Sequence, residues 1–317
     1  MSTAQRIVIT GGTGFVGRAV CERLVAQLPG VRLVVPTRRL AAARSILTLP
    51  GVEPVVADVH NPAQAAALLT GADALVHLVA ILHGSATAFE RVHVQLPQTL
   101  AAAARAAGVR RVVHVSALGV AADAPSAYLR SKAAGEAVWR ASGLATTVLR
   151  PSVIFGRDDQ FTNLFAQLLR LFPVMPLAGA DARFQPVAVG DVAQAVVSSL
   201  LQADRVGAGV GAASTPLATI ECAGPEVLTL RQIVQRIGQL AGCARPVIAL
   251  PEAAGMLQAA LLGLLPGQPL MSRDNLLSMR VPNVATSTLP GLASLGITPV
   301  GLDSLASHFN PRPAYQP

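Results

Sequence analysis

The chain has 317 residues, of which 52% are apolar and 13% charged, a composition that excludes a disordered or fibrous protein. The formal charge is +8, but the arginines are scattered and no basic run exceeds two residues, so we predict no nucleic-acid partner. Three cysteines without a CxxC spacing, and no basic-then-apolar leader at the amino terminus, predict a cytoplasmic protein with reduced thiols.

The first half of the chain alternates short apolar strands with helices. In chain order, we expect strands at residues 6–10, 31–35, 54–57, 74–80, 112–116 and 146–150, and helices at 15–28, 62–69, 88–107 and 127–142. Strands and helices that alternate at this spacing form βαβ units around a parallel sheet. We therefore predict an α/β fold: a Rossmann-type doubly wound parallel sheet of six or seven strands, in a nucleotide-binding domain over residues 1–155.

Beyond residue 151 this alternation gives way to a different pattern. We expect helices at residues 161–172 and 191–203, an extended stretch at 182–189, and a loop rich in glycine and alanine at 206–216. Thr229 and Gln232 form a capping box that opens another helix, ending near Leu240. These elements predict a smaller C-terminal substrate domain over residues 156–317, which covers the cleft at the carboxyl edge of the sheet. The helix at 191–203 is expected to return to the first domain.

A glycine-rich segment, Thr10-Gly-Gly-Thr-Gly-Phe-Val-Gly17, lies between the first expected strand and the first expected helix. In this position Gly11 permits a tight turn, Gly14 lets the backbone approach a pyrophosphate, and Gly17 lets the helix pack on the strand. The unpaired N–H groups at the helix N-terminus then attract the phosphates. The predicted cofactor-binding residues of this segment are Gly11, Thr13, Gly14, Phe15, Val16 and Gly17.

The end of the second strand indicates which dinucleotide is bound. NAD-binding folds carry an acid there for the ribose hydroxyls, whereas an arginine accommodates the 2′-phosphate of NADP. Here Arg38 and Arg39 follow the strand, and no acid occurs from Leu33 to Ser45. We therefore expect NADP(H) to be favoured over NAD(H), with both arginines near the 2′-phosphate. The alternative is that they only line the sheet edge and NAD binds.

Tyr128 and Lys132 form a Tyr-x-x-x-Lys pair on an expected helix, so that both side chains lie on one face. A phenol with a pKa of about 10 is a poor acid or base at neutral pH, and an adjacent ammonium lowers that pKa. The same ammonium can hold a cofactor ribose, while Ser116, at the end of the fifth strand, can orient a substrate oxygen. Lys132 is the single lysine among 25 basic residues. The alternative is a packed tyrosine beside a solvated lysine.

Together, these motifs resemble the short-chain dehydrogenase/reductase superfamily in its extended and atypical branches, which include NAD-dependent epimerase/dehydratase-like proteins. The resemblance identifies Ser116, Tyr128 and Lys132 as a catalytic triad, with Lys132 also on the cofactor. It implies an oxidoreductase that moves a hydride between nicotinamide and an unidentified small carbonyl or alcohol substrate. It also implies cofactor contacts from the loops after the third, fourth and sixth strands: Asp58 and Val59, Val79 and Ala80, and Pro151 and Val153.

A closer resemblance comes from longer segments, among them Tyr128-Leu-Arg-Ser-Lys-Ala-Ala-Gly-Glu136 and Leu149-Arg-Pro-Ser-Val-Ile-Phe-Gly156. They are similar to the group around the nucleotide-binding accessory subunit of respiratory complex I, whose bacterial members stand alone. In that subunit the nucleotide serves structure rather than turnover. This resemblance implies a second hypothesis, a non-catalytic nucleotide-binding assembly or stability factor near respiratory-chain or quinone machinery. The short spacing between Ser116 and Tyr128 disfavours a sugar-nucleotide substrate.

Other features are expected to be structural. His77 and His114 lie within expected core strands, where hydrogen bonds usually satisfy a histidine. No His, Cys or Asp cluster has metal-ligand spacing, so we predict no metal. Residues 253–265 are almost wholly apolar but too few to span a bilayer, which needs about 20 residues. We expect a helix buried in the C-terminal domain there, with peripheral contact at the inner face of the membrane, or oligomer packing, as alternatives.

Overall fold

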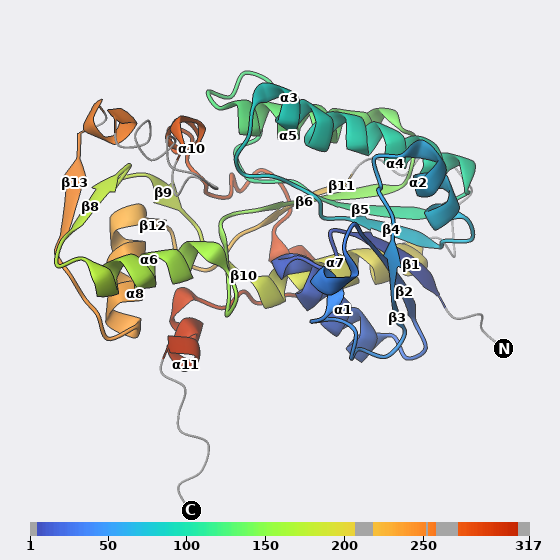
Figure 1. Ribbon diagram of the computed structural model, residues 1–317, viewed down its shortest axis with the longest axis horizontal. Helices are drawn as coiled ribbons and strands as arrows, with labels where there is room; N and C mark the ends of the chain where they lie inside the picture. Colours follow the sequence, from blue (N-terminus) through green and yellow to red (C-terminus); the bar gives the residue numbers. More distant parts are fainter. Residues whose placement is uncertain (1–4, 207–217, 252, 258–271, 310–317) are drawn as a thin grey trace, which may run out of the picture.

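The computed structural model describes residues 5–206, 218–251, 253–257 and 272–309. Seven parallel strands form its central sheet in the order β11-β6-β5-β4-β1-β2-β3 (Figure 1). Their bounds are β1 (Arg6–Thr10), β2 (Arg32–Thr37), β3 (Val52–Val56), β4 (Ala74–His77), β5 (Arg111–Val115), β6 (Thr146–Pro151) and β11 (Ala218–Cys222). The strand order runs outward in both directions from β1 and β4, which is the doubly wound arrangement. The predicted Rossmann-type α/β fold is confirmed.

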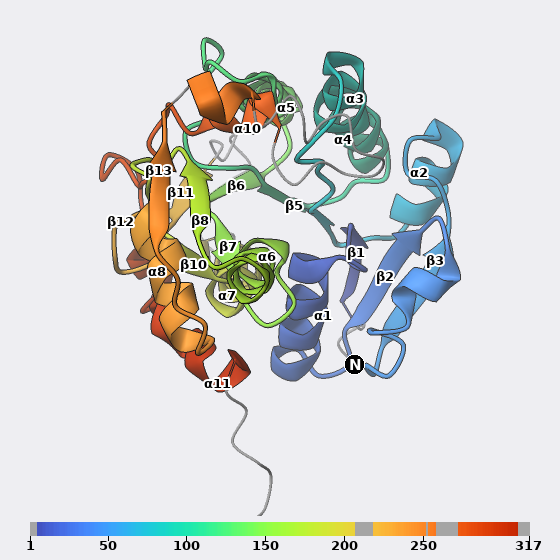
Figure 2. The ribbon, with the colours of Figure 1, turned by 60° about the vertical axis from the view of Figure 1, so that its left-hand side comes forward.

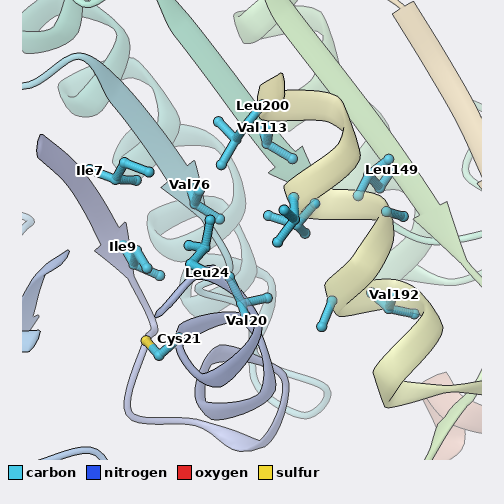
Figure 3. Packing of buried hydrophobic residues seen from close by; sticks show 14 of the residues in the cluster. Ile7, Ile9, Val20, Cys21, Leu24, Val76, Val113, Leu149, Val192 and Leu200 are labelled. Carbon is cyan, nitrogen blue, oxygen red and sulfur yellow. The ribbon is translucent and has the colours of Figure 1, made fainter. Parts of the chain in front are cut away.

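Helices cover both faces of this sheet, which explains why a strand such as β4 is buried along its whole length. Over one face lie α2 (Pro62–Leu69), α4 (Leu96–Ala106) and α5 (Ala127–Ala141); over the other lie α1 (Phe15–Gln27) and α7 (Val189–Val206) (Figure 1). Figure 3 shows the second layer, where Leu24 of α1 and Leu200 of α7 pack in one cluster with Val113 of β5. This packing holds the loops at the carboxyl ends of the strands in place.

Local signals set the starts of helices where the sequence predicts them. The Asn61 side chain accepts hydrogen bonds from two amides in the first turn of α2. At α8 (Leu230–Leu240), the Thr229 hydroxyl accepts from the Gln232 amide, and the Gln232 side chain accepts from the Thr229 amide. The predicted capping box is therefore confirmed, and with it the start of α8.

The long helix expected at residues 88–107 is not uniform. It consists of α3 (Ala86–Glu90), a π-helical turn η2 (Arg91–Gln95) and α4. A single π-helical turn within an α-helix frequently marks a functional site, because the wider turn redirects side chains. Here the turn faces α5, and a Cβ added to Gly135 of α5 would lie 2.2 Å from the His93 carbonyl oxygen. The absence of a side chain at Gly135 thus allows this close approach.

The C-terminal part of the chain forms a second packing unit beside the sheet (Figure 2). Helices α6 (Gln160–Leu171) and α8 pack on a parallel pair of strands, β8 (Met175–Ala178) and β13 (Val247–Leu250). Two further short pairs are β7 (Ile154–Phe155) with β10 (Val187–Ala188), and β9 (Arg183–Phe184) with β12 (Leu228–Thr229). The remaining elements are η1 (Leu40–Ala43), α10 (Arg273–Ser278), η3 (Leu292–Leu295), η4 (Leu302–Leu305) and α11 (Ala306–Phe309).

The chain passes between these two units more than once. After β10 it returns through α7, which packs on α1, and then through β11, which joins the central sheet beside β6. The boundary between domains at residues 155/156 stays a prediction. The predicted loop at 206–216 lies outside the described residues except for residue 206, and of residues 253–265 only 253–257 are described. Within the described parts of the chain, no helix is both long and apolar enough to cross a membrane.

Candidate active site

Most of the predicted site residues lie at one edge of the central sheet. They follow the carboxyl ends of the strands in turn: the glycine-rich segment after β1, Arg38 and Arg39 after β2, Asp58 and Val59 after β3, Val79 and Ala80 after β4, and Ser116 after β5. Parallel strands end at the same edge, so these loops border the point between β1 and β4 where the strand order reverses. Doubly wound proteins bind dinucleotides at this point.

The glycine loop has the geometry that a pyrophosphate requires. Gly11 adopts a φ of +78°, and a Cβ on Gly17 would lie 2.3 Å from the Gly11 carbonyl oxygen, so both positions require glycine within the protein. Gly14 is exposed, and a Cβ there would approach only that same oxygen, at 3.3 Å. Gly14 has no side chain to cap α1, so the first-turn amides remain available to an anion. Its neighbours on this loop and first turn are Thr13, Phe15 and Val16.

Positive side chains gather beyond the ends of β2 and β3. Arg38 and Arg39 are exposed, and neither guanidinium has an ion-pair partner among the described residues. The Asp58 carboxylate accepts a hydrogen bond from the His60 amide at 3.0 Å. Burial lowers the pKa of His60, the Asp58 charge opposes this, and the charges of Arg91 and Arg38 lower the pKa further. Arg91, which the sequence analysis does not predict, therefore adds positive potential to this end of the site.

The loops after β4 and β6 carry the remaining predicted cofactor contacts. A Cβ on Gly11 would lie 3.1 Å from the Val79 amide nitrogen, so the backbone after β4 runs directly against the glycine loop, and Ala80 beyond it is exposed. Pro151 ends β6 and is buried. The Val153 amide donates a hydrogen bond to Asn283 Oδ1 at 2.9 Å. The Val153 carbonyl oxygen accepts from the Val187 amide at 3.0 Å, so both main-chain groups of Val153 are engaged within the protein and its side chain is left for a ligand.

Lys132 of α5 is buried, with only 2% of the residue exposed. Its Nζ donates a hydrogen bond at 2.8 Å to the carbonyl oxygen of Val115, the residue before Ser116. Burial lowers the pKa of Lys132 to about 8, opposed by the nearby carboxylate of Glu136, which Arg150 holds through two hydrogen bonds. An ammonium carries three N–H donors. Within the described part of the chain, two donors of Lys132 therefore remain for ligand oxygens such as ribose hydroxyls.

The Ser116 hydroxyl is buried and has no hydrogen-bond partner among the described residues. Its backbone is held in place, because the Ser116 amide donates to the Leu149 carbonyl oxygen at 2.7 Å. A buried hydroxyl without a partner is unfavourable unless a ligand or water satisfies it. Ser116 is therefore suited to bind an oxygen atom of a substrate or cofactor.

Tyr128 precedes Lys132 by one helical turn on α5 and is only partly exposed. Its ring contacts His93 edge-on, with 5.6 Å between centroids, and Phe89 at 6.1 Å. Burial raises the pKa of Tyr128 to about 12, so the phenol is protonated at neutral pH. In the described geometry Lys132 Nζ donates to the Val115 carbonyl oxygen, and the lowering of the Tyr128 pKa by this ammonium stays a prediction.

His93 reaches the site from the π-helical turn and is not predicted from the sequence. Its Nε2 accepts a hydrogen bond from the Ile81 amide at 3.1 Å, and its Nδ1 lies 2.8 Å from Ser131 Oγ. The Ser131 hydroxyl donates to the Tyr128 carbonyl oxygen, so it accepts from Nδ1, and the imidazole is the neutral Nδ1–H tautomer. Burial, followed by the charge of Lys132, lowers the pKa of His93 to about 3. His93 thus links the loop after β4 to the turn of α5 that carries Tyr128.

His77 and His114 are buried as predicted, but they are incompletely hydrogen-bonded. Their rings stack at 5.2 Å between centroids, next to Trp139 of α5. His77 Nδ1 pairs with the Thr10 hydroxyl at 2.8 Å, whereas both ring nitrogens of His114 lack a partner among the described residues. The expectation of a satisfied core histidine is therefore wrong for His114. Burial lowers the pKa of both rings, to about 3 for His77, so both are neutral. The described residues contain no cluster of three or more metal-ligating side chains.

Comparison with known proteins gives a family and several relatives. A family model described as NAD(P)H-binding matches residues 11–203. The chain is 34% identical over 217 residues to NADH dehydrogenase (ubiquinone) 1 alpha subcomplex subunit 9, mitochondrial, of Mus musculus, which covers 68% of this chain and 55% of that protein. It is 33% identical over 201 residues to a ceramide reductase of Caulobacter vibrioides, covering 63% of this chain and 62% of that protein. The chain thus spans about half the length of the mouse relative.

A solved structure agrees with the fold. The NADPH-dependent quinone oxidoreductase QOR2 of Escherichia coli, complexed with NADPH, aligns with a TM-score of 0.73 at 24% identity. The alignment covers 95% of this chain and 99% of that one. At this level of identity the likeness concerns the fold alone.

Proposed function

The chain belongs to the NAD(P)H-binding family, and on this premise we propose that it is an NADP(H)-dependent oxidoreductase. Within the family it lies near the complex I alpha subcomplex subunit 9 group, among proteins of the extended short-chain dehydrogenase/reductase type. The proposed reaction moves a hydride between nicotinamide and a carbonyl or alcohol carbon. Ser116, Tyr128 and Lys132 are the proposed catalytic residues.

The observation that carries this proposal is the buried ammonium of Lys132, which binds the carbonyl oxygen of the residue before Ser116, together with a Ser116 hydroxyl that has no partner among the described residues. Burial of a charge with one hydrogen bond destabilises a fold, and such groups are concentrated at functional sites. Every other basic residue of the chain is an arginine. A compact ammonium at this one position fits a role that a guanidinium does not perform.

The protonated Tyr128 phenol is suited to the reduction of a carbonyl. Tyr128 has a pKa of about 12, so it holds its proton at neutral pH and can donate it to a carbonyl oxygen that gains negative charge. When bound, the reduced nicotinamide supplies the hydride that the carbonyl carbon accepts. Ser116 Oγ orients the carbonyl oxygen, and the Lys132 ammonium stabilises the phenolate that remains on Tyr128 until solvent returns a proton. The products are an alcohol and the oxidised dinucleotide.

The preference for NADP(H) rests on Arg38 and Arg39. Both guanidinium groups are exposed after β2 without an ion-pair partner among the described residues, and no carboxylate stands in their place. A 2′-phosphate carries the charge and the acceptor oxygens that such arginines bind, whereas a ribose hydroxyl does not. The nearby Arg91 adds to the same potential.

A second function, a non-catalytic nucleotide-binding assembly factor near respiratory-chain or quinone machinery, has support of its own. It is favoured by the 34% identity to a complex I subunit. In such a protein Lys132 would hold the ribose alone. The two functions share the same dinucleotide site and differ in whether Tyr128 reacts.

A turnover screen separates the two functions. The purified protein is mixed with NADPH and, in turn, quinones, small ketones and ketones with long apolar chains, and the loss of reduced nicotinamide is followed. Tyr128→Phe, which keeps the ring but removes the proton donor, is the matched blank. Oxidation of NADPH that requires a carbonyl substrate and is lost in Tyr128→Phe supports the enzyme. NADPH binding without turnover of any substrate in either form supports the assembly factor.

A further inference from the structure

The helix that carries Tyr128 and Lys132 has a second cap that comes from the C-terminal part of the chain. Ser126 is the N-cap residue of α5, and its hydroxyl accepts a hydrogen bond from the Leu129 amide at 3.2 Å. The two amides ahead of Leu129 are bound by Asp274 of α10. One Asp274 carboxylate oxygen accepts from the Ala127 amide at 2.7 Å, and the other accepts from the Tyr128 amide at 2.9 Å.

This contact satisfies groups that a helix cannot satisfy by itself. The first amides of a helix have no partner within it, and the helix N-terminus carries a partial positive charge. A carboxylate that binds two of these amides makes charge-assisted hydrogen bonds, which are shorter and stronger than neutral ones. Asp274 and Tyr128 are 146 residues apart in the chain, so the contact exists only when α10 is docked on α5. Figure 1 shows α10 next to one end of α5.

The segment that follows α10 contacts other loops of the same site. A Cβ on Gly119, in the loop after Ser116, would lie 3.0 Å from a methyl group of Val281. Two residues further, Asn283 Oδ1 accepts hydrogen bonds from Ser152 Oγ at 2.6 Å and from the Val153 amide at 2.9 Å. The described residues from Asp274 to Asn283 thus run from the Tyr128 amide to the loop after β6, which is predicted to contact the cofactor.

From these contacts we infer that Asp274 is a positioning residue for Tyr128. The Asp274 carboxylate holds the first turn of α5, so the position of the Tyr128 phenol depends on the docking of α10 on α5. The inference rests on the proposed function insofar as Tyr128 reacts. The contact itself does not depend on turnover. The Asp274 carboxylate accepts hydrogen bonds from the two α5 amides, and its charge also opposes the lowering by burial of the pKa of His83, in the loop after β4. The proposed effect on Tyr128 passes through the backbone of α5.

Amide hydrogen exchange followed by NMR tests the contact directly. In the full-length parent protein, the Ala127 and Tyr128 amides should be protected. In Asp274→Ala they should exchange roughly tenfold faster, the ratio expected for the loss of one charge-assisted hydrogen bond. Ser126→Ala is the matched control, because it removes a cap from the same helix but should release Leu129 and leave Ala127 and Tyr128 protected.

Asp274→Asn keeps the inference testable if the alanine variant fails to fold. Its single amide oxygen can accept from one of the two amides, so one should remain protected and the other should exchange faster. Unchanged exchange of the Ala127 and Tyr128 amides in both Asp274 variants would overturn the inference.

A second readout separates positioning from a merely structural role. Trp139, the chain's one tryptophan, lies on α5, and its emission is absorbed by reduced nicotinamide, so energy transfer reports NADPH binding. Asp274→Ala should bind NADPH with parent affinity and, with a reducible substrate, lower kcat by roughly tenfold or more while KM changes little. Equal kcat in the two proteins would contradict positioning. A parent without any turnover would contradict the proposed function, and the exchange experiment would then decide the role of Asp274 alone.

Discussion

The two ends of the dinucleotide site are built in different ways. At the phosphate end, the consecutive residues from Thr10 to Gly17 form the whole loop, and a Cβ added to Gly17 would overlap the Gly11 carbonyl oxygen within that segment. At the Tyr128 end, the contacts of His93, Asp274 and Asn283 span 38, 146 and 130 residues of the chain. The phosphate end is thus encoded in one short segment, whereas the Tyr128 end exists only when distant parts of the chain are assembled.

This difference separates binding from chemistry. The glycine loop needs only the first strand, the first helix and the backbone after β4, so it can hold a nucleotide whatever the state of α10. The Tyr128 end also needs the π-helical turn and the C-terminal segment. A relative could therefore keep nucleotide binding and lose turnover through changes far from either ligand. The same site is thus compatible with both proposed functions.

The largest effect is expected at the local end, from a pair of glycine variants. Gly17→Val should prevent folding, with a loss above about 4 kcal/mol, because its Cβ would overlap the Gly11 carbonyl oxygen at 2.3 Å. Gly14→Val should fold with a parent-like thermal midpoint but bind NADPH at least roughly 100-fold more weakly, because its side chain fills the space of the pyrophosphate. Thermal unfolding and calorimetry measure the two quantities. Parent affinity in Gly14→Val would show that the loop is wrongly assigned.

The next largest effect concerns Lys132, whose buried ammonium lowers the free energy of unfolding. Its pKa is about 8 in the folded protein against an ordinary 10.5, so the unfolded chain binds the extra proton between these values and the penalty is complete below pH 8. At pH 7, Lys132→Met should be more stable than the parent by up to about 3 kcal/mol. This gap should shrink as the pH rises from about 8 to 10.5.

Urea unfolding across this pH range measures the gap. Arg140→Met, which removes an exposed cation from the same helix, is the matched control and should show no such pH dependence. A Lys132→Met protein less stable than the parent at pH 7 would show that the ammonium is satisfied within the fold.

A smaller effect is expected at the Tyr128 end from His93→Leu. The change leaves the half-buried Ile81 amide without its acceptor, so the protein should lose about 2 kcal/mol of stability at pH 7. The pKa of His93 is lowered from 6.5 to about 3, so the unfolded chain binds the extra proton below pH 6.5 and the parent loses stability there. The difference between parent and variant should therefore narrow by about 2 kcal/mol between pH 6.5 and about pH 5.

Denaturant titrations at several pH values test this account of His93. His308→Leu removes a histidine but leaves the Ile81 and Ser131 contacts intact, so it is the matched control. A constant difference between parent and His93→Leu across this range would mean that His93 is not held as the neutral tautomer.

The smallest effect is expected from the arginines after β2. The parent should bind NADPH more tightly than NADH, and Arg38→Ala/Arg39→Ala should reduce that preference by roughly tenfold, because the 2′-phosphate loses its charge-assisted hydrogen bonds. Calorimetry with both dinucleotides measures it. Arg44→Ala, an exposed arginine of the same segment, should keep the preference. Equal affinities of the parent for NADPH and NADH would contradict the assignment of Arg38 and Arg39 to the 2′-phosphate.

The parts of the molecule that follow from the sequence are those encoded locally. The glycine loop, the Asn61 cap and the capping box at Thr229 depend on residues within one or two helical turns, so their spacing is visible in the sequence. The six strands of the first half are apolar runs separated by helices, and this alternation predicts the parallel sheet. The seventh strand, β11, contains the buried Glu221, whose carboxylate is held by Thr286 from a distant segment, so it lacks an apolar strand pattern.

The parts that the sequence does not reveal depend on long-range contacts. Spacing and strand ends predict Lys132 and Ser116, but the hydrogen bond from Lys132 to Val115 depends on how α5 sits over β5. The burial that raises the pKa of Tyr128 depends on tertiary packing in the same way. Asp274 has no local pattern that marks it as a cap for a helix 146 residues away. The extra residue of the π-helical turn that directs His93 likewise follows from packing against α5.

The central claim is that the Lys132 ammonium serves both the phenol and the nucleotide, and Lys132→Arg tests it most directly. Arginine keeps the positive charge, but its wide planar group cannot keep the position of a buried ammonium bound to the Val115 carbonyl oxygen. Turnover and NADPH affinity are measured side by side in parent and variant. The account predicts a turnover lowered by roughly 100-fold or more with a more modest loss of affinity. A Lys132→Arg protein that reduces the same carbonyl substrate as fast as the parent would contradict it.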